Sequence, residues 1–243
     1  VIELARPEKF NCLSGAVHRA LRAALADAHA DPAVRAVLLC AQGKHFCTGA
    51  DLEEVQQVRG AGQFSEFIAL GHAVLQEYEA SPLPVVAAVQ GLALAGGLEL
   101  LLAADVVFAG QGTRIGDQHA QYGLVPGWGG TQRLTRKVGL GRALDLMYSA
   151  RWLDAPEAQA WGLVNHVVPD AELRTAALAY CARLGTRSRA GLAAMKSLAR
   201  TGAELPLAQA LALEARDAEV AMRATDVDEG LDAFKNRRDP HFP

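Results

Sequence analysis

Two glycine-containing segments could stabilise a developing negative charge. Thr48-Gly49 and Gly96-Gly97 each follow an apolar run that predicts a strand, and Gly96 also opens a short predicted helix. The first turn of a helix leaves backbone N–H groups without internal partners, and these groups favour negative charge. Two such groups converging from separate loops would form an oxyanion hole for a thioester enolate or a tetrahedral intermediate. Glycines between a strand and a helix are also common as plain turn residues.

One carboxylate accompanies the second glycine segment. Glu99 lies three residues after Gly96, in the first turn of the predicted helix. A glutamate there could simply complement the helix dipole or cap the helix. In a cleft it could instead act as a general base or acid, with burial raising its pKa toward neutrality.

The elements that must position these residues alternate between strands and helices. Strands are predicted over Val1–Leu4, Val34–Cys40, Val85–Val89 and Asp105–Ala109, and helices over Ala16–Ala30, Phe64–Ala80 and Gly96–Ala103. Alternation of this kind favours an α/β fold with largely parallel pairing.

From Gly139 onward the pattern becomes almost wholly helical. Helices are predicted over Gly141–Ser149, Ala155–Trp161, Asp170–Leu184, Gly191–Arg200, Leu207–Arg223 and Asp226–Asn236. The last opens with Asp226 three residues before Glu229, which is typical of a capping box. We therefore expect an α/β core over residues 1–185 and a helical C-terminal oligomerisation region over residues 186–243.

Composition excludes several classes of protein. The chain has 243 residues, 51% of them hydrophobic, and a net charge of −3, which indicates a globular protein with a sizeable core and no nucleic-acid partner. No uninterrupted apolar run approaches the ~18 residues of a membrane span. The four cysteines have no metal-ligand or disulfide spacing, so we expect reduced thiols in a cytoplasmic protein without a metal. A catalytic Cys47 is the alternative, but it lacks an evident base.

Several motifs in order resemble the crotonase superfamily of enoyl-CoA hydratases and isomerases. Phe46-Cys47-Thr48-Gly49-Ala50-Asp51-Leu52 and the segment from Gln90 to Leu100 resemble the two oxyanion-hole signatures. Further similarity lies in Arg6–Asn11, Pro126–Leu134, Ala160–Val164 and Gly230–Phe234. The resemblance implies a crotonase-like β-α superhelical (spiral) core, with Thr48 and Gly96 as the two N–H donors.

The chain departs from the hydratases at the second catalytic carboxylate. Hydratases of this superfamily use two glutamates, and Glu99 matches one of them. Counting back from Pro126 without gaps, the place of the other falls on His119. Histidine exchanges protons near neutral pH and could replace the carboxylate, and Asp117 is a second candidate. In structural terms, His119 could be an ordinary loop residue and Asp117 a helix cap.

The resemblance also implies contacts to coenzyme A. Backbone groups of Ala50, Asp51 and Leu52 would contact the adenine, and Gly97 is a further candidate contact. Lys9 and the C-terminal cluster of Lys235, Arg237 and Arg238 would contact the phosphates. A basic C-terminus is more often a solvated helix end. Trp128 and Tyr122 could line the acyl pocket or pack in the core.

Taken together, these features predict an acyl-CoA enzyme. The leading hypothesis is an enoyl-CoA hydratase-like lyase that uses Glu99 with His119 or Asp117, and needs no cofactor because coenzyme A is part of the substrate. Isomerisation, decarboxylation, thioester hydrolysis or non-catalytic binding of a CoA ester are the alternatives. The superfamily implies a homotrimer or a dimer of trimers, without membrane or nucleic-acid partners.

Overall fold

A five-stranded parallel sheet forms the base of the fold in a computed structural model that describes residues 1–242. Its order is β1 (Ile2–Leu4), β2 (Val37–Ala41), β3 (Val85–Val89), β5 (Val106–Gly110) and β8 (His166–Val168). Every neighbouring pair is parallel. All residues of β2 and β3 are buried, as expected for strands that are covered on both faces.

A second, smaller sheet contains β4 (Leu92–Leu94), β6 (Arg114–Gly116) and β7 (Leu153–Asp154). Strands β4 and β6 pair in parallel, and β6 and β7 pair antiparallel. None of these strands was predicted, and each has only two or three residues, too few to show a period.

The remaining elements of the α/β core are helices. They are α1 (Gly15–Ala30), α2 (Leu52–Gly60), α3 (Phe64–Ala80), α4 (Gly96–Leu102), α5 (Gly130–Val138), α6 (Leu140–Ser149), α7 (Ala155–Ala160) and α8 (Leu173–Gly185), with 3-10 turns at Pro7–Lys9, Ala120–Tyr122 and Asp170–Glu172. Helices α1, α3, α4 and α6–α8 agree with the prediction to within a few residues. Helices α2 and α5 were not predicted.

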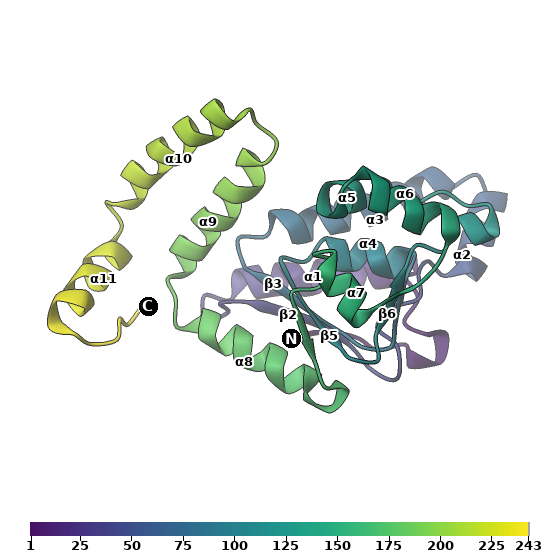
Figure 1. Cartoon of the computed structure of the whole chain (residues 1–243), viewed down its shortest axis with the longest axis horizontal. Coiled ribbons are helices and arrows are strands. Elements are labelled where there is room, and N and C mark those ends of the chain that lie inside the picture. The colour runs from purple at the N-terminus through teal and green to yellow at the C-terminus, as the bar shows by residue number, and fades with distance from the viewer. Residues whose placement is uncertain (243) are drawn as a thin grey trace.

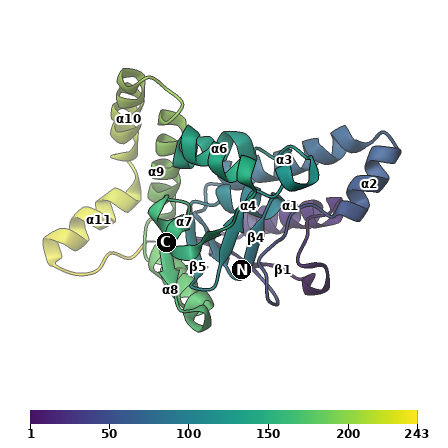
Figure 2. The same ribbon diagram turned by 45° about the vertical axis from the view of Figure 1, so that its right-hand side comes forward.

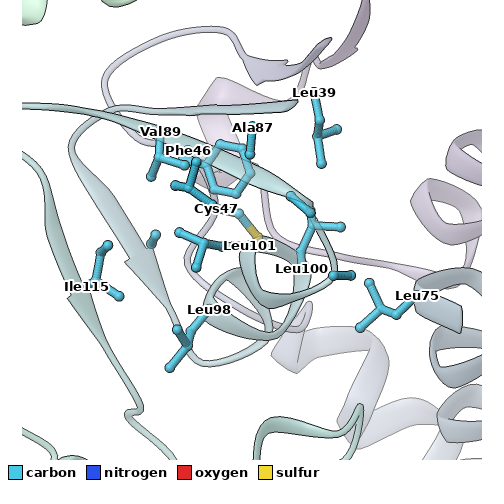
Figure 3. Close-up of a cluster of buried hydrophobic side chains, with 14 of the residues drawn as sticks. Leu39, Phe46, Cys47, Leu75, Ala87, Val89, Leu98, Leu100, Leu101 and Ile115 are labelled. Atoms are coloured by element: carbon cyan, nitrogen blue, oxygen red, sulfur yellow. The ribbon is translucent and has the colours of Figure 1, made fainter. Parts of the chain in front are cut away.

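Helix α4 lies within the hydrophobic core. Leu98, Leu100 and Leu101 are almost completely buried, and Figure 3 shows them among side chains such as Phe46 and Ala87 from the surrounding elements. Because a helix that is apolar on every side must be buried, the single carboxylate in it, Glu99, is buried with it.

The C-terminal helices leave the α/β body as an arm. Helix α9 (Arg189–Gly202) is fixed to the core through Lys196 and Arg200, which form ion pairs with Asp105 at 2.7 and 2.8 Å. Helices α10 (Leu207–Ala221) and α11 (Thr225–Asn236) extend away from the body in both views (Figures 1 and 2).

The arm has almost no core of its own. Helix α10 has no buried residue, and only one residue of α11 is buried. Large apolar side chains are exposed along it, at Leu207, Leu211, Val220, Met222, Leu231 and Phe234. The boundary between residues 185 and 186 stays a prediction.

Two details differ from the expectations for the ends of helices. Helix α11 begins at Thr225, one residue before Asp226, and its N-cap residue is Ala224, which has no side chain that can cap it. The Asp226 carboxylate accepts a hydrogen bond from the Ser188 hydroxyl. Strand β2 begins at Val37 and not at Val34, which follows an exposed turn at Asp31–Ala33. No helix within residues 1–242 is long and apolar enough to cross a membrane.

Candidate active site

The Glu99 carboxylate is held by backbone N–H groups of the loop that leads into α5. Its Oε1 atom accepts hydrogen bonds from Trp128 N at 2.7 Å and Gly130 N at 2.8 Å. The side chain is buried, and burial raises the pKa of Glu99 above its usual range, although the two N–H groups and the nearby His119 oppose that rise. With Oε1 occupied, Oε2 is the oxygen that remains for proton transfer.

His119 and Asp117 form a hydrogen-bonded pair. The Asp117 Oδ1 atom lies 2.9 Å from His119 Nδ1 and also accepts the His119 backbone N–H at 3.1 Å. A carboxylate accepts only, so Nδ1 carries the proton and Nε2 is left for chemistry. Burial disfavours a charge on His119, but the hydrogen bond to Asp117 and the charges of Asp117 and Glu99 outweigh it and raise the pKa of His119.

The first expected oxyanion donor needs correction. The Thr48 N–H already donates to the Phe10 carbonyl at 3.3 Å. Ala50 offers the alternative, because its N–H donates to no residue within the described range while its neighbours Gly49 and Asp51 pair with Leu13. The resemblance implied only a coenzyme A contact for Ala50, whereas the structure leaves its N–H available as a donor.

Ala50 and Gly96 lie side by side. A Cβ atom added to Gly96 would be 3.3 Å from Ala50 N, and one added to Gly49 would be 3.5 Å from Gly96 N. Gly96 is the first residue of α4, so its N–H is not used inside the helix. The N–H groups of Ala50 and Gly96 can therefore converge on one anionic oxygen.

The backbone at Ala95 is strained immediately before the second donor. Ala95 has φ 50° and ψ −117°, a left-handed conformation that a residue with a Cβ rarely adopts. The Ala95 N–H donates to the Gly116 carbonyl, and the Ala95 carbonyl accepts the Glu99 N–H, both at 3.0 Å. These two bonds hold the turn that presents the Gly96 N–H.

A cavity of about 310 Å³ opens beside these groups. Its lining includes Thr48, Ala50, Ala95 and His119. The rest of the lining comes from the 3-10 turn at Pro7–Lys9, the start of α2 and the loop around Tyr122, with Phe10, Cys12, Gln118 and Leu124 as lining residues that were not expected from the sequence. Among the described residues, Glu99 and Trp128 lie outside this lining.

The expected coenzyme A contacts fall in two separate places. Lys9, Asp51 and Leu52 line the cavity. Lys9 pairs with Glu53 at 2.9 Å, and Asp51 pairs with Arg6 at 3.2 Å and caps α2. Lys235 lies on α11, far out on the arm and away from this cavity within one chain (Figure 1).

Three further candidate residues have different surroundings. Tyr122 is 64% exposed and stands at the cavity mouth, not in the core. Gly97 is buried, and a Cβ added to it would lie 2.2 Å from the Cys47 carbonyl oxygen, so this glycine permits close packing. Trp128 is buried against Gly96, Gly71, His18 and Phe67.

A larger hollow of about 1220 Å³ lies between α3, α5 and α9. Its charged side chains pair with one another, as in Arg133 with Glu79 at 2.5 Å and Lys196 with Asp105 at 2.7 Å. Because His119 lines the smaller cavity and not this hollow, the smaller cavity is the candidate active site.

The thiols do not add a nucleophile to the site, although Cys12 lines the cavity, because burial raises the pKa of Cys12 to about 11. All four cysteines are free, and burial raises the pKa of Cys47 to about 12, so a nucleophilic thiolate at Cys47 is disfavoured. Within residues 1–242 no group of three or more His, Cys, Asp or Glu side chains is arranged to hold a metal ion.

Comparison with known proteins identifies the family. The sequence model of the family described as Enoyl-CoA hydratase/isomerase matches residues 1–243. A probable enoyl-CoA hydratase of Rhodobacter capsulatus is 38% identical over 249 residues, covering 100% of this chain and 93% of that protein. A crotonyl-CoA hydratase of Syntrophomonas wolfei is 34% identical over 243 residues, with the same coverage of 100% and 93%.

Solved structures agree with the sequence comparison. An enoyl-CoA hydratase from a Polaromonas species has a TM-score of 0.95 at 29% identity, covering 99% of this chain and 95% of that one. The enoyl-CoA hydratase of Bacillus anthracis has a TM-score of 0.91 at 33% identity, covering 99% and 94%. The chain therefore belongs to the enoyl-CoA hydratase/isomerase, or crotonase, family. It has the α/β fold of that family with C-terminal helices, and it is an enzyme of the family, as the sequence analysis expected.

Proposed function

We propose that this protein is an enoyl-CoA hydratase-like lyase that adds water to the double bond of a 2-enoyl-CoA. The observation that carries the proposal is the placement of one carboxylate and one histidine, Glu99 and His119, within electrostatic reach of each other beside the Ala50 and Gly96 N–H groups. Hydration needs a base for water, an acid for carbon and a stabiliser for the enolate. The site offers all three.

The reaction can be written with each proton accounted for. Ionised Glu99 takes a proton from water through Oε2 while the water oxygen bonds to C3 of the substrate. The electrons of the double bond move into the thioester, whose oxygen is stabilised by the N–H groups of Ala50 and Gly96. Protonated His119 then gives its Nε2 proton to C2, and Asp117 stabilises the charged imidazole until that step. After product release, Glu99 loses its proton to solvent and His119 takes one up from solvent, which restores the starting state.

The test is direct. Purified protein should convert crotonyl-CoA to 3-hydroxybutyryl-CoA, seen as loss of the enoyl-thioester absorbance and as a product heavier by one water in mass spectrometry. A Gln variant at Glu99 serves as the matched control for contaminating activity. The proposal fails if enoyl-CoAs of several chain lengths yield no 3-hydroxyacyl product.

Isomerisation is the second candidate, and the free Oε2 of Glu99 favours it. One carboxylate oxygen is enough to carry a proton from C2 to C4 of a 3-enoyl-CoA, so the absence of a second glutamate harms this reaction less than hydration. A 3-enoyl-CoA assay separates the two. Formation of 2-enoyl-CoA without further hydration would support isomerisation.

We also propose that the arm assembles the protein into a homotrimer or a dimer of trimers. The exposed apolar side chains of α10 and α11 support this, because large exposed apolar patches mark interaction surfaces. Assembly would also give Lys235 a route to a phosphate group in the site of a neighbouring copy. Light scattering coupled to size exclusion should give three or six times the chain mass of 25.7 kDa. A monomer at micromolar concentration would contradict the proposal.

A further inference from the structure

We infer that Trp128 closes the acyl end of the site and restricts the enzyme to short acyl chains of about four carbons. The inference rests on the proposed function, in that it assumes an acyl-CoA thioester bound with its carbonyl oxygen at Ala50 and Gly96. The substrate class that follows is the short-chain acyl-CoA thioesters.

The indole lies directly beside the second N–H donor. A Cβ added to Gly96 would be 2.8 Å from Cζ3 of Trp128, so the six-membered ring of the indole covers the backbone there. The backbone N–H of the same residue binds Glu99. When C2 and C3 of the acyl chain lie at Glu99 and His119, the carbons beyond C3 therefore contact the indole.

Three neighbours fix the indole in place. A Cβ added to Gly71, in the middle of α3, would lie 2.2 Å from Trp128 Nε1, so the indole occupies the space of a missing side chain. The rings of His18 and Phe67 are centred 4.6 and 5.4 Å from the indole. The indole is 2% exposed, and turning it aside would require α1 or α3 to move.

The size and lining of the cavity are consistent with this position of the indole. Ala95 and His119 line the 310 Å³ cavity, whereas Trp128 does not, because it is packed in the hydrophobic core next to Gly96. The volume of this cavity is near the lower limit of about 300 Å³ for small-molecule pockets. A cavity of this size, with the indole beside Gly96, favours a short acyl group.

Chain-length dependence tests the inference. In an open apolar pocket each added methylene strengthens binding about fourfold, which corresponds to about 0.8 kcal/mol. We expect wild-type kcat/KM to fall at least tenfold from crotonyl-CoA to 2-decenoyl-CoA. Trp128→Ala should remove this fall or reverse it, and Trp128→Phe should shift the limit by a smaller amount. Trp161→Ala, which removes a partly exposed tryptophan elsewhere, should leave the profile unchanged.

Two results would overturn the inference. One is wild-type turnover of 2-decenoyl-CoA equal to that of crotonyl-CoA. The other is a folded Trp128→Ala protein with the wild-type profile. If Trp128→Ala does not fold, the wild-type profile and the Phe variant still decide the question.

A binding measurement separates this inference from the proposed function. Calorimetric titration with saturated butyryl-CoA and decanoyl-CoA requires no turnover. Selective binding of butyryl-CoA, lost in Trp128→Ala, supports the short site even if hydratase activity is absent. Hydration of long and short enoyl-CoAs at equal rates supports the function and overturns the short site. Failure of both ligands to bind overturns both.

Discussion

Trp128 holds Glu99 through its backbone while its side chain fills the space beside Gly96. The N–H donates to Glu99 Oε1 at 2.7 Å, and the indole would be 2.8 Å from a Cβ at Gly96. One residue therefore couples the position of the proposed acid/base group to the shape of the proposed acyl site. A substitution that changes the loop from Pro126 to Gly130 would disturb both, whereas truncation of the indole alone should leave the hydrogen bond intact.

Glu99→Gln should abolish proton transfer and preserve the fold. The amide oxygen of glutamine can still accept the N–H groups of Trp128 and Gly130, so no buried donor loses its partner. We expect kcat to fall by about 10²–10⁴-fold with little change in KM. Steady-state kinetics with crotonyl-CoA, beside a urea unfolding curve, provide the check. Full activity in the Gln variant would exclude Glu99 as the base.

Asp117→Asn should move the alkaline limb of the pH profile to lower pH. In the proposed mechanism, kcat/KM rises with pH as Glu99 ionises and falls as His119 loses its proton. Asp117 raises the pKa of His119, so its removal lowers that pKa and the activity is lost sooner as pH rises.

The control is Asp145→Asn, which removes a carboxylate that pairs with Arg151 on the surface. Its alkaline limb should coincide with that of wild type. An unmoved limb in Asp117→Asn would mean that His119 is not the titrating acid.

His18 should make the fold sensitive to acid. It is fully buried, neither ring nitrogen has a hydrogen-bond partner among the described residues, and burial lowers its pKa to about 4. Below pH 6.5 the unfolded chain binds this proton and the native protein does not, so stability falls as pH drops from 6.5 toward 4. The contribution is about 2 kcal/mol between pH 6.5 and pH 5.

His18→Phe keeps an aromatic ring against Trp128 and removes the titration. Urea unfolding at the two pH values should show a smaller loss of stability in this variant than in wild type, by about the same amount. His72→Gln, on α3, is the matched control and should lose as much as wild type. Equal losses in wild type and His18→Phe would contradict the prediction.

Ala95→Gly should not destabilise the protein. Glycine adopts the left-handed backbone without strain, and a non-glycine residue there costs about 1–3 kcal/mol. Ala26→Gly, at an exposed position inside α1, should instead cost about 1 kcal/mol of unfolding free energy. Denaturant titration of both variants measures the contrast, and similar losses in the two would refute the assignment of strain to Ala95.

Much of the core architecture is predictable because its elements are long and strongly patterned. The ranges of α3 and β3 agree with the prediction at both ends. Helix α2 was overlooked because its residues are polar, yet Asp51 three residues before Glu54 is a visible start signal, and the Asp51 side chain does cap the helix. The small second sheet was missed because its strands are too short to show a pattern.

The candidate site is predictable in its side chains but not in its backbone. Glu99 and His119 could be proposed because, by resemblance to the hydratases, they fall at the positions of the two catalytic glutamates. The choice of Ala50 over Thr48 as a donor could not, because it depends on which N–H the Phe10 carbonyl already accepts. Backbone direction changes from one residue to the next in a loop, and the identities of Thr48 and Ala50 give no information about it.

Gly71 and Trp128 should be energetically coupled. In wild type, Gly71→Ala would place a methyl group 2.2 Å from the indole nitrogen and should cost about 1–3 kcal/mol by overpacking. In a Trp128→Ala background the same change should be nearly neutral or stabilising, because alanine is the better helix former. Unfolding free energies of the four proteins form the cycle. Equal costs in both backgrounds would show that the two residues act independently.

The contact between Gly71 and Trp128 also imposes an order on evolutionary change. A lineage moving from a short to a long acyl substrate could lose the indole first, at the expense of a cavity, and then fill the helix at position 71. The reverse path passes through a clash. Only one of the two single-step intermediates avoids a clash, so the two substitutions should occur in a fixed order: a large residue at position 71 should be found only where the residue at position 128 is already small.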